Sequence, residues 1–249
     1  MKKAYFISDL HLGANYITDH REHEARVIRF LDSIAGDAGE LYLLGDILDY
    51  WYEYKNVVPR GHVRFFGALA RLADAGVKIT WITGNHDVWL FDYLRDEIGI
   101  TVYNGTQEVD IMGHRFLISH GDDVGYQKPM YRFTRWCFYN PVCQWLYASI
   151  HPRWTHAVAK GWSCSNRMRR KPELPAEVKR SPAIDHLCDY VRLHEQTTHN
   201  EYYVFGHLHV ALQEQVEGTN TTMTILGDWI QRDTYAVFDG TSLNLKKFK

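Results

Sequence analysis

Five short runs of apolar and aromatic residues recur along the chain, at positions 4–7, 41–44, 79–82, 116–118 and 202–205. Each run is followed directly by Ser, Thr or Gly. Continuous apolar runs of this length are typical of strands that are buried on both faces. Between two of them Leu69, Leu72 and Ala73 stand at i, i+3 and i+4, a spacing that predicts a helix.

The order of these patterns predicts an alternation of strands and helices. Strands are expected at 4–8, 41–45 and 77–83, with helices near 21–35, 61–75 and 88–98. A hairpin is expected around Gly113-His114, a further helix near 183–197, and then a strand-rich part with turns at 217–220 and 239–242. This alternation predicts an α/β fold of two stacked mixed β-sheets flanked by helices. With 249 residues, 45% of them hydrophobic, we expect residues 1–249 to form a single domain.

Side chains of the types that bind metals follow all five predicted strands. The candidate ligands are Asp9, His11, Asp46, Asn85, His120, His207 and His209. Because neighbouring strands of one sheet end at the same edge, these side chains are expected to converge. Nitrogen and oxygen ligands without cysteine favour Mn, Fe, Zn or Co over a closed structural zinc site.

The spacing within the motifs suggests two cations. Asp9 and His11 lie two apart, so in an extended strand their side chains would share a face. Asp46 carries two carboxylate oxygens and could bridge two ions, and His209 could turn to the ion that His207 does not reach. Two divalent cations are suited to phosphate ester hydrolysis, because they activate a water molecule and neutralise phosphoryl charge.

His86 and Asp87 follow Asn85 directly and are not needed as ligands. The imidazole of His86 could protonate a leaving oxygen, or it could only position a phosphate. Asp87 is expected to orient His86 or to cap the following helix.

Residues 126–171, here called the lid, interrupt the strand pattern. They contain nine Lys or Arg residues and no Asp or Glu, although the whole chain has a net charge of −2. They also hold four of the eight tryptophans, and prolines at 141 and 152 are expected to separate helical stretches. A basic, aromatic helical segment beside the metals suits an amphiphilic anionic substrate or an anionic lipid surface. The alternatives are simple packing of the aromatic residues on the body, or binding of single-stranded nucleic acid.

The ordered set Asp9-x-His11, Gly45-Asp46, Gly84-Asn85-His86-Asp87, His120-Gly121-Asp122 and Gly206-His207-x-His209 resembles the calcineurin-like metallophosphoesterase superfamily. The resemblance implies that Asp9, His11, Asp46 and His209 hold one metal. It implies that Asp46, Asn85, His120 and His207 hold the other, with Asp46 bridging the two.

A narrower resemblance extends over most of the chain. Tyr126, the basic lid and the Leu226-Gly227-Asp228-Trp229 segment are similar to those of bacterial UDP-2,3-diacylglucosamine diphosphatases. That family implies cleavage of UDP-2,3-diacylglucosamine to 2,3-diacylglucosamine 1-phosphate and UMP, with Mn2+, at the cytoplasmic face of the inner membrane. It also implies substrate contacts by Asn85, His86 and His207 and by the lid residues Tyr126, Ser165, Asn166 and Arg167. Many members have Arg where this chain has His86.

Other features of the sequence limit where the protein can act and what it can bind. The four cysteines show no C-x-x-C spacing and are expected to be free thiols, as in the cytoplasm. No stretch approaches the roughly 20 apolar residues of a membrane helix, so we expect a cytoplasmic protein held peripherally at the inner membrane. Neither nucleic acid nor an obligate protein partner is expected. The alternatives are a metallophosphoesterase for another nucleotide, phosphodiester or phosphoprotein, and a non-enzymatic metal-binding scaffold.

Overall fold

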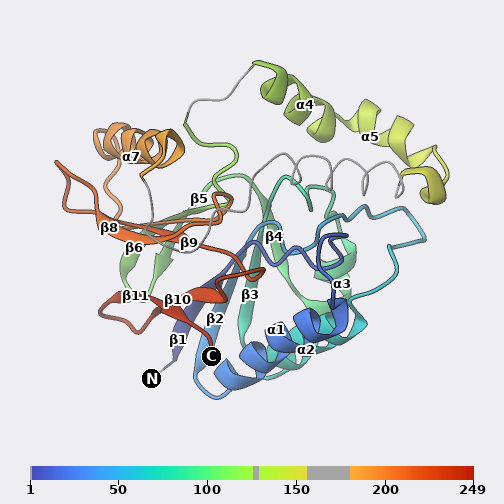
Figure 1. Cartoon of the computed structure of the whole chain (residues 1–249), viewed down its shortest axis with the longest axis horizontal. Coiled ribbons are helices and arrows are strands. Elements are labelled where there is room, and N and C mark those ends of the chain that lie inside the picture. The colour runs from blue at the N-terminus through green and yellow to red at the C-terminus, as the bar shows by residue number, and fades with distance from the viewer. Residues whose placement is uncertain (1, 126–128, 156–179) are drawn as a thin grey trace.

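The computed structural model describes residues 2–125, 129–155 and 180–249, and it shows two β-sheets with helices on their outer faces (Figure 1). The larger sheet has the strand order β11-β10-β1-β2-β3-β4, and the smaller has the order β5-β6-β7-β9-β8. The strands are β1 (Lys3–Ile7), β2 (Ala38–Leu44), β3 (Lys78–Thr83), β4 (Thr101–Asn104), β5 (Gln107–Ile111), β6 (His114–Ser119), β7 (Tyr202–Phe205), β8 (Ala211–Gln215), β9 (Thr222–Leu226), β10 (Thr234–Phe238) and β11 (Leu243–Lys247). The helices are α1 (His20–Ile34), α2 (Val63–Asp74), α3 (Tyr93–Ile98), α4 (Pro129–Tyr139), α5 (Pro141–Ala148) and α7 (Pro182–Glu195).

Each sheet is mixed. In the larger one β1, β2, β3 and β4 are parallel, whereas β10 pairs antiparallel with both β1 and β11. In the smaller one β6, β7 and β9 are parallel, and β5 and β8 are antiparallel edge strands. Parallel neighbours require crossover connections, which α1, α2 and α7 provide. The prediction of two mixed sheets flanked by helices is therefore confirmed.

The core is layered because side chains of a strand alternate between its two faces. From β1, Tyr5 and Ile7 pack on the layer that contains α1 and α2, whereas Ala4 and Phe6 face the second sheet. The Phe6 ring stacks on Tyr42 of β2, with centroids 4.9 Å apart, and on Phe116 of β6, with centroids 5.8 Å apart. The outer face of the smaller sheet is covered by the apolar side of α7. Burial on both faces explains why the strands read as continuous apolar runs.

Two details differ from the expected elements. The helix expected near 88–98 begins only at Tyr93, because Val88 and Trp89 instead pack in an aromatic cluster beside the lid helices. Strand β4 was not expected. Most of its residues are exposed or half-buried, so it lacks the apolar signal of the inner strands and is held by its pairing with β3.

Helices α4 and α5 form the described part of the lid and lie along one side of the body (Figure 1). Pro141 is the first residue of α5 and Asn140 caps it, so the expected break falls between the two helices. Neither helix buries a residue completely. Within the described ranges, no helix is long and apolar enough to cross a membrane.

Candidate metal centre

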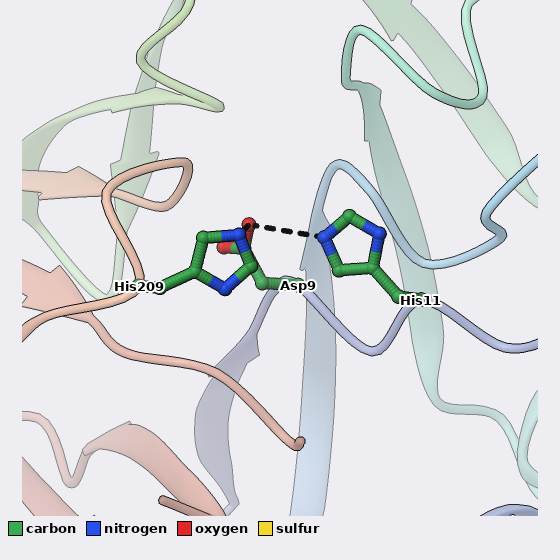
Figure 2. A group of neighbouring side chains, drawn as sticks. All are labelled: Asp9, His11 and His209. Carbon is green, nitrogen blue, oxygen red and sulfur yellow. Dashed lines mark ion pairs between the residues drawn. The ribbon is translucent and has the colours of Figure 1, made fainter. Parts of the chain in front are cut away.

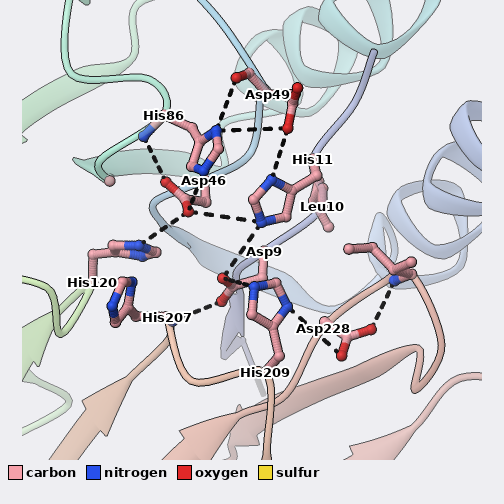
Figure 3. A network of polar contacts seen from close by, with 12 residues as sticks. Asp9, Leu10, His11, Asp46, Asp49, His86, His120, His207, His209 and Asp228 are labelled. Carbon is pink, nitrogen blue, oxygen red and sulfur yellow. Dashed lines mark hydrogen bonds and ion pairs between the residues drawn. The ribbon is translucent and has the colours of Figure 1, made fainter. Parts of the chain in front are cut away.

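Six of the seven candidate ligands, all but Asn85, meet beyond the carboxyl ends of β1, β2, β6 and β7 (Figure 3), and Asn85 follows the end of β3. Asp9, His11 and His209 form one group whose ligand atoms all lie within 4.8 Å of one another. Asp46, His120 and His207 form a second group by the same criterion. Asp46 lies between the two groups. Its Oδ2 is 3.7 Å from His11 Nε2 of the first group and 3.3 Å from His120 Nε2 of the second.

The first group is drawn in Figure 2, where both imidazoles point toward the carboxylate of Asp9. Asp9 Oδ1 lies 3.8 Å from His11 Nε2 and 3.5 Å from His209 Nε2. These separations exceed a hydrogen bond, so the three atoms leave a point between them that a cation could occupy. In the second group, the rings of His120 and His207 meet edge to face with centroids 5.1 Å apart.

The backbone at these ligands is unusual, and it corrects the expectation for Asp9 and His11. Neither residue is extended: their φ angles are 53° and 47°. Left-handed φ is also found at three further candidate ligands, Asp46, His207 and His209. Non-glycine residues adopt this region rarely and at a cost of about 1–3 kcal/mol, and such residues cluster at functional sites. At these five ligands, the side chains converge because the chain turns sharply after β1, β2 and β7.

Glycines permit this close approach of loops. A Cβ at Gly206 would lie 2.7 Å from Asp9 Oδ2, and one at Gly45 would lie 2.6 Å from His120 Nδ1. In both cases the site would have to widen. The glycine that precedes a ligand in these motifs is thus a packing requirement of the site.

Hydrogen bonds fix which nitrogen each histidine presents. His120 Nδ1 donates to the carbonyl oxygen of Leu44 at 2.9 Å, and His11 Nδ1 donates to Asp49 Oδ1 at 3.2 Å. Since these acceptors cannot donate, Nδ1 carries the hydrogen and Nε2 faces the cluster with its lone pair. This is how histidine ligands of metals are oriented in proteins.

Buried atoms without partners test whether this cluster suits a cation. Among the described residues, Asp9 Oδ1, His11 Nε2, Asn85 Oδ1 and His120 Nε2 are buried and have no hydrogen-bond partner. Polar atoms are rarely left in this state unless they have another role, and the atoms of Asp9, His11 and His120 belong to the groups described above. Oxygen and imidazole nitrogen donors without sulfur suit a hard or borderline divalent cation, so the residues fit the metals that the sequence predicted.

The buried charges also shift the acidity of the groups. Burial raises the pKa of Asp9 to about 7. Burial opposes protonation of His120, but the carboxylates of Asp46 and Asp9 outweigh it and raise the His120 pKa well above its usual range. Burial opposes ionisation of Asp46, but the positive charges of His120 and His86 outweigh it and hold the Asp46 pKa well below its usual range. Protons thus balance charge in the metal-free site, and cations that bind there would release them.

His86 lies at the edge of this cluster. Its backbone N–H donates to Asp46 Oδ1 at 2.9 Å, and its ring Nδ1 donates to the carbonyl oxygen of Asp49 at 3.0 Å. Its Nε2 is 4.0 Å from Asp46 Oδ2 and is part of a third group with His11 and Asp46. Burial opposes protonation of the ring, but Asp46 and Asp49 outweigh it and raise the pKa of His86.

Asp87 has a different role from the one expected. Its carboxylate accepts hydrogen bonds from the backbone N–H groups of Ile47 at 2.8 Å and Gly84 at 2.7 Å. It therefore ties the turn after β2 to the turn after β3, and it caps no helix. Burial raises its pKa to about 6.

Two further acids were not identified as site residues from the sequence. Asp49 contacts His11, as above, and its Oδ1 is 3.6 Å from His86 Nδ1. Asp228 Oδ2 is 3.8 Å from His209 Nδ1, and its Oδ1 caps the backbone after β9 (Figure 3). The Gly45-Asp46-x-x-Asp49 spacing could have suggested the first, whereas the second joins the site only through the fold.

Tyr126, Ser165, Asn166 and Arg167 lie outside the described residues, as does Cys164. The other three cysteines, Cys137, Cys143 and Cys188, are free thiols, as expected.

Comparison with known proteins agrees with this geometry. The family model of the calcineurin-like phosphoesterases matches residues 2–211. The chain belongs to the calcineurin-like phosphoesterase family. It is therefore a metal-dependent hydrolase, as the resemblance implied.

Three relatives share nearly the full length of the chain. A "UDP-2,3-diacylglucosamine hydrolase" of Porphyromonas gingivalis is 38% identical and covers 99% of this chain and 98% of its own. A protein of the same name from Nitrosococcus oceani is 30% identical, covering 90% of this chain and 86% of its own. One from Neisseria meningitidis is 29% identical, covering 92% of this chain and 90% of its own.

Proposed function

We propose that this chain hydrolyses the pyrophosphate bond of UDP-2,3-diacylglucosamine, releasing 2,3-diacylglucosamine 1-phosphate and UMP for lipid A synthesis. The observation that carries the proposal is the 38% identity, over nearly the whole length of both chains, with the Porphyromonas gingivalis hydrolase named for this substrate. The proposal is supported by the metal-binding groups at the strand ends, which contain six of the seven candidate ligands.

In this proposal Asp9, His11, Asp46 and His209 hold one cation, and Asp46, Asn85, His120 and His207 hold the other. Mn2+ is the cation that we propose for both positions. When bound, such cations lower the pKa of a water molecule and neutralise charge on phosphoryl oxygens. The chain's own residues orient the ligands through Leu44, Asp49 and Asp228, and they exclude bulk water from the buried carboxylates.

Asn85 and His86 are proposed to contact the substrate phosphate. The Nδ1–H of His86 is held by the Asp49 carbonyl, so Nε2 remains for the phosphate. When the ring is protonated, its Nε2–H can donate to a phosphoryl oxygen. A donor aimed at charge that develops in the transition state lowers the barrier by about 3 kcal/mol in comparable sites.

The lid is proposed to bind the acyl chains and an anionic membrane surface. On α4, Met130, Phe133 and Trp136 are 57–75% exposed, and on α5 Val142, Trp145 and Leu146 are 54–68% exposed. Exposed apolar side chains of this number on two short helices mark a contact surface. The excess of basic residues in the lid suits the negative inner leaflet, so we propose peripheral attachment there. Tyr126, Ser165, Asn166 and Arg167 remain predicted substrate contacts.

A second candidate is a phosphoesterase for a different nucleotide, phosphodiester or phosphoprotein. It is favoured by His86, because an imidazole at this position can supply a proton as well as bind phosphate, whereas the arginine of many diacylglucosamine enzymes cannot.

Turnover of UDP-2,3-diacylglucosamine with added Mn2+, beside a chromogenic phosphodiester, tests both candidates. Fast release of UMP and slow cleavage of the chromogenic ester are expected. Metal-dependent cleavage of the chromogenic ester without release of UMP would contradict the lipid substrate and support the second candidate.

A further inference from the structure

A cavity of about 350 Å3 opens beside the metal centre. Its walls include Leu12 and Gly13, which directly follow the candidate ligand His11, and Asp49, which holds the ring of His11. The cavity therefore borders the first metal group. Its volume lies within the range of sites for small organic ligands.

Two helices begin at this cavity. His20 is the first residue of α1, His62 precedes the first residue of α2, and both line the cavity. Helices α1 and α2 have 15 and 12 residues, so each N-terminus carries a partial positive charge from aligned peptide dipoles. Carboxylates already accept from both helix starts, Asp19 from the N–H of Glu22 and Glu24 from the N–H of Phe65, so an additional anion must be held mainly by side chains of the cavity.

Guanidinium groups add to this positive field. Arg21 and Arg60 line the cavity, and neither makes a hydrogen bond or ion pair within the described parts of the chain. The two carboxylates in the wall are already engaged: Glu24 Oε1 accepts from the backbone N–H of Phe65 at 3.2 Å, and Asp49 holds His11. The cavity thus offers unpaired donors of the kind that bind phosphate in two-pronged contacts.

An aromatic wall completes the cavity. Tyr50 lines it, and its hydroxyl group lies 3.1 Å from that of Tyr147 on α5, which keeps the ring in place. A fixed aromatic face is suited to contact with a nucleobase. The carbonyl oxygens of uracil are acceptors, which matches the donors of the cavity.

Helix α4 of the lid also approaches the metal centre, beside His120. Arg135 of α4 pairs with Asp122 at 2.7 Å, and Asp122 follows the candidate ligand His120 by two residues. The centre is therefore bordered by a cavity with two unpaired arginines next to His11, and by a helix with exposed apolar side chains next to His120. A substrate that joins a nucleotide to a lipid through a pyrophosphate has one polar end, which suits the cavity, and one apolar end, which suits the lid helix.

We propose that the cavity lined by Arg21, Arg60 and Tyr50 binds the nucleotide half of the substrate, a uridine 5′-phosphate group, while the lid receives the acylated half. This assignment rests on the proposed function, because that function supplies a substrate with a nucleotide end. It adds the residues that recognise that end.

The test is calorimetric titration of UMP, and separately of inorganic phosphate, into the Mn2+-loaded full chain. The variants are Arg21→Ala, Arg60→Ala and their combination. Arg64→Ala serves as the matched control, because Arg64 is an exposed arginine of α2 that does not line the cavity. Turnover of a chromogenic phosphodiester that lacks a nucleotide reports whether the metal centre is intact.

We expect the double variant to bind UMP at least about tenfold more weakly, since two charge-assisted contacts are lost. Turnover of the chromogenic ester should stay unchanged, and Arg64→Ala should match the parent chain. Unchanged UMP affinity in the double variant would overturn the proposal. So would a parent chain that binds UMP no more tightly than phosphate.

Failure of the proposed function gives a different result. If the parent chain does not hydrolyse UDP-2,3-diacylglucosamine but binds UMP through Arg21 and Arg60, the lipid substrate is wrong and the nucleotide site stands. If the lipid substrate is hydrolysed and the double variant has the same KM and UMP affinity as the parent chain, the function stands and the nucleotide site is wrong.

Discussion

At the scale of single residues, the candidate centre depends on a few carboxylates that several groups share. Asp46 lies within 4.0 Å of the imidazole nitrogens of His11, His86 and His120, and it stands between the two metal groups. Its backbone is left-handed, with φ 52°, and its N–H is held by Asp87. The position of one side chain therefore determines the geometry of both groups.

Asp46→Ala should abolish most activity and metal binding, because it removes a ligand from both cations. We expect turnover to fall by more than about a thousandfold and the bound metal to fall below two ions per chain. Metal analysis and hydrolysis of the lipid substrate measure this, with the exposed Asp74→Ala as control. An Asp46→Ala chain with normal turnover and metal content would contradict the bridging role.

Asp49→Asn should weaken metal binding without removing a ligand. Asp49 accepts the Nδ1–H of His11. Replacing its carboxylate with an amide removes the negative charge, so the ring of His11 can change its tautomer and orientation. Loss of a partner of this kind costs about tenfold to a hundredfold in metal affinity. Competition with a chelator measures the affinity, and Asp49→Glu should recover part of it. Equal affinity in Asp49→Asn and the parent chain would show that Asp49 does not orient His11.

At the scale of elements, the lid is joined to the body by two different contacts. Trp89 packs against Phe138 and Tyr147, with ring centroids 5.0 Å and 4.7 Å apart. Arg135 and Tyr131 of α4 both reach Asp122, each at 2.7 Å. The aromatic contacts hold α5 and the end of α4, whereas the polar contacts place the start of α4 beside His120.

Arg135→Ala should loosen α4 and impair use of the lipid substrate selectively. The half-buried guanidinium is lost, and the buried carboxylate of Asp122 is left with Tyr131 as partner. We expect KM for UDP-2,3-diacylglucosamine to rise at least about threefold, since one charge-assisted bond is lost. Turnover of a small chromogenic phosphodiester should change little.

Arg132→Ala is the matched control on the same helix, because Arg132 is exposed and makes no contact with Asp122. An equal effect of Arg132→Ala and Arg135→Ala on KM would mean that the charge of the lid matters and the Asp122 contact does not.

At the scale of the whole molecule, two sheets that pack face to face bring their strand ends to one place. Ala4, Phe6, Tyr42 and Phe116 form part of the layer between them. Because the larger sheet carries Asp9, Asp46 and Asn85 and the smaller carries His120 and His207, this layer fixes the distance between the two halves of the site.

Metal binding should therefore raise the free energy of unfolding, and it should do so more at alkaline pH than at acidic pH. The pKa values of Asp9 and Asp87 rise from 3.8 to about 7 and about 6 on folding. Between about pH 3.8 and pH 7, the folded chain keeps protons that the unfolded chain has lost. The metal-free protein therefore loses stability as the pH rises through this range. Bound cations neutralise the carboxylates and offset that loss.

Thermal unfolding with Mn2+ and with a chelator, at pH 6 and at pH 8, measures this effect. We expect the difference in Tm between the two conditions to be larger at pH 8. A difference that is equal at both pH values, or larger at pH 6, would show that the buried acids of the site do not control stability.

The charge distribution predicts a salt-dependent attachment to anionic membranes. Nine of the 28 Lys and Arg residues lie in the lid, which has none of the 30 acidic residues. Sedimentation with vesicles should show binding to anionic lipid that largely disappears at about 1 M salt, where screening acts within roughly 3 Å. Vesicles of neutral phosphatidylcholine are the control, and equal binding to both would contradict an electrostatic attachment.

The sequence by itself determined the strands and the types of ligand. Apolar runs with a polar residue at each end predicted β1, β2, β3, β6 and β7 and the seven candidate ligands, because burial on both faces leaves a local pattern. It did not predict β4, whose stability comes from pairing with β3, or the late start of α3.

Only the tertiary structure decided how the ligands meet. The left-handed backbone at Asp9, His11 and Asp46 depends on contacts between loops that are far apart in sequence, such as the hydrogen bonds from Asp87. The pairing of Asp228 with His209 and the cavity between the starts of α1 and α2 likewise join distant segments. Contacts of this kind leave no period in the sequence, because each depends on the packing of the whole chain.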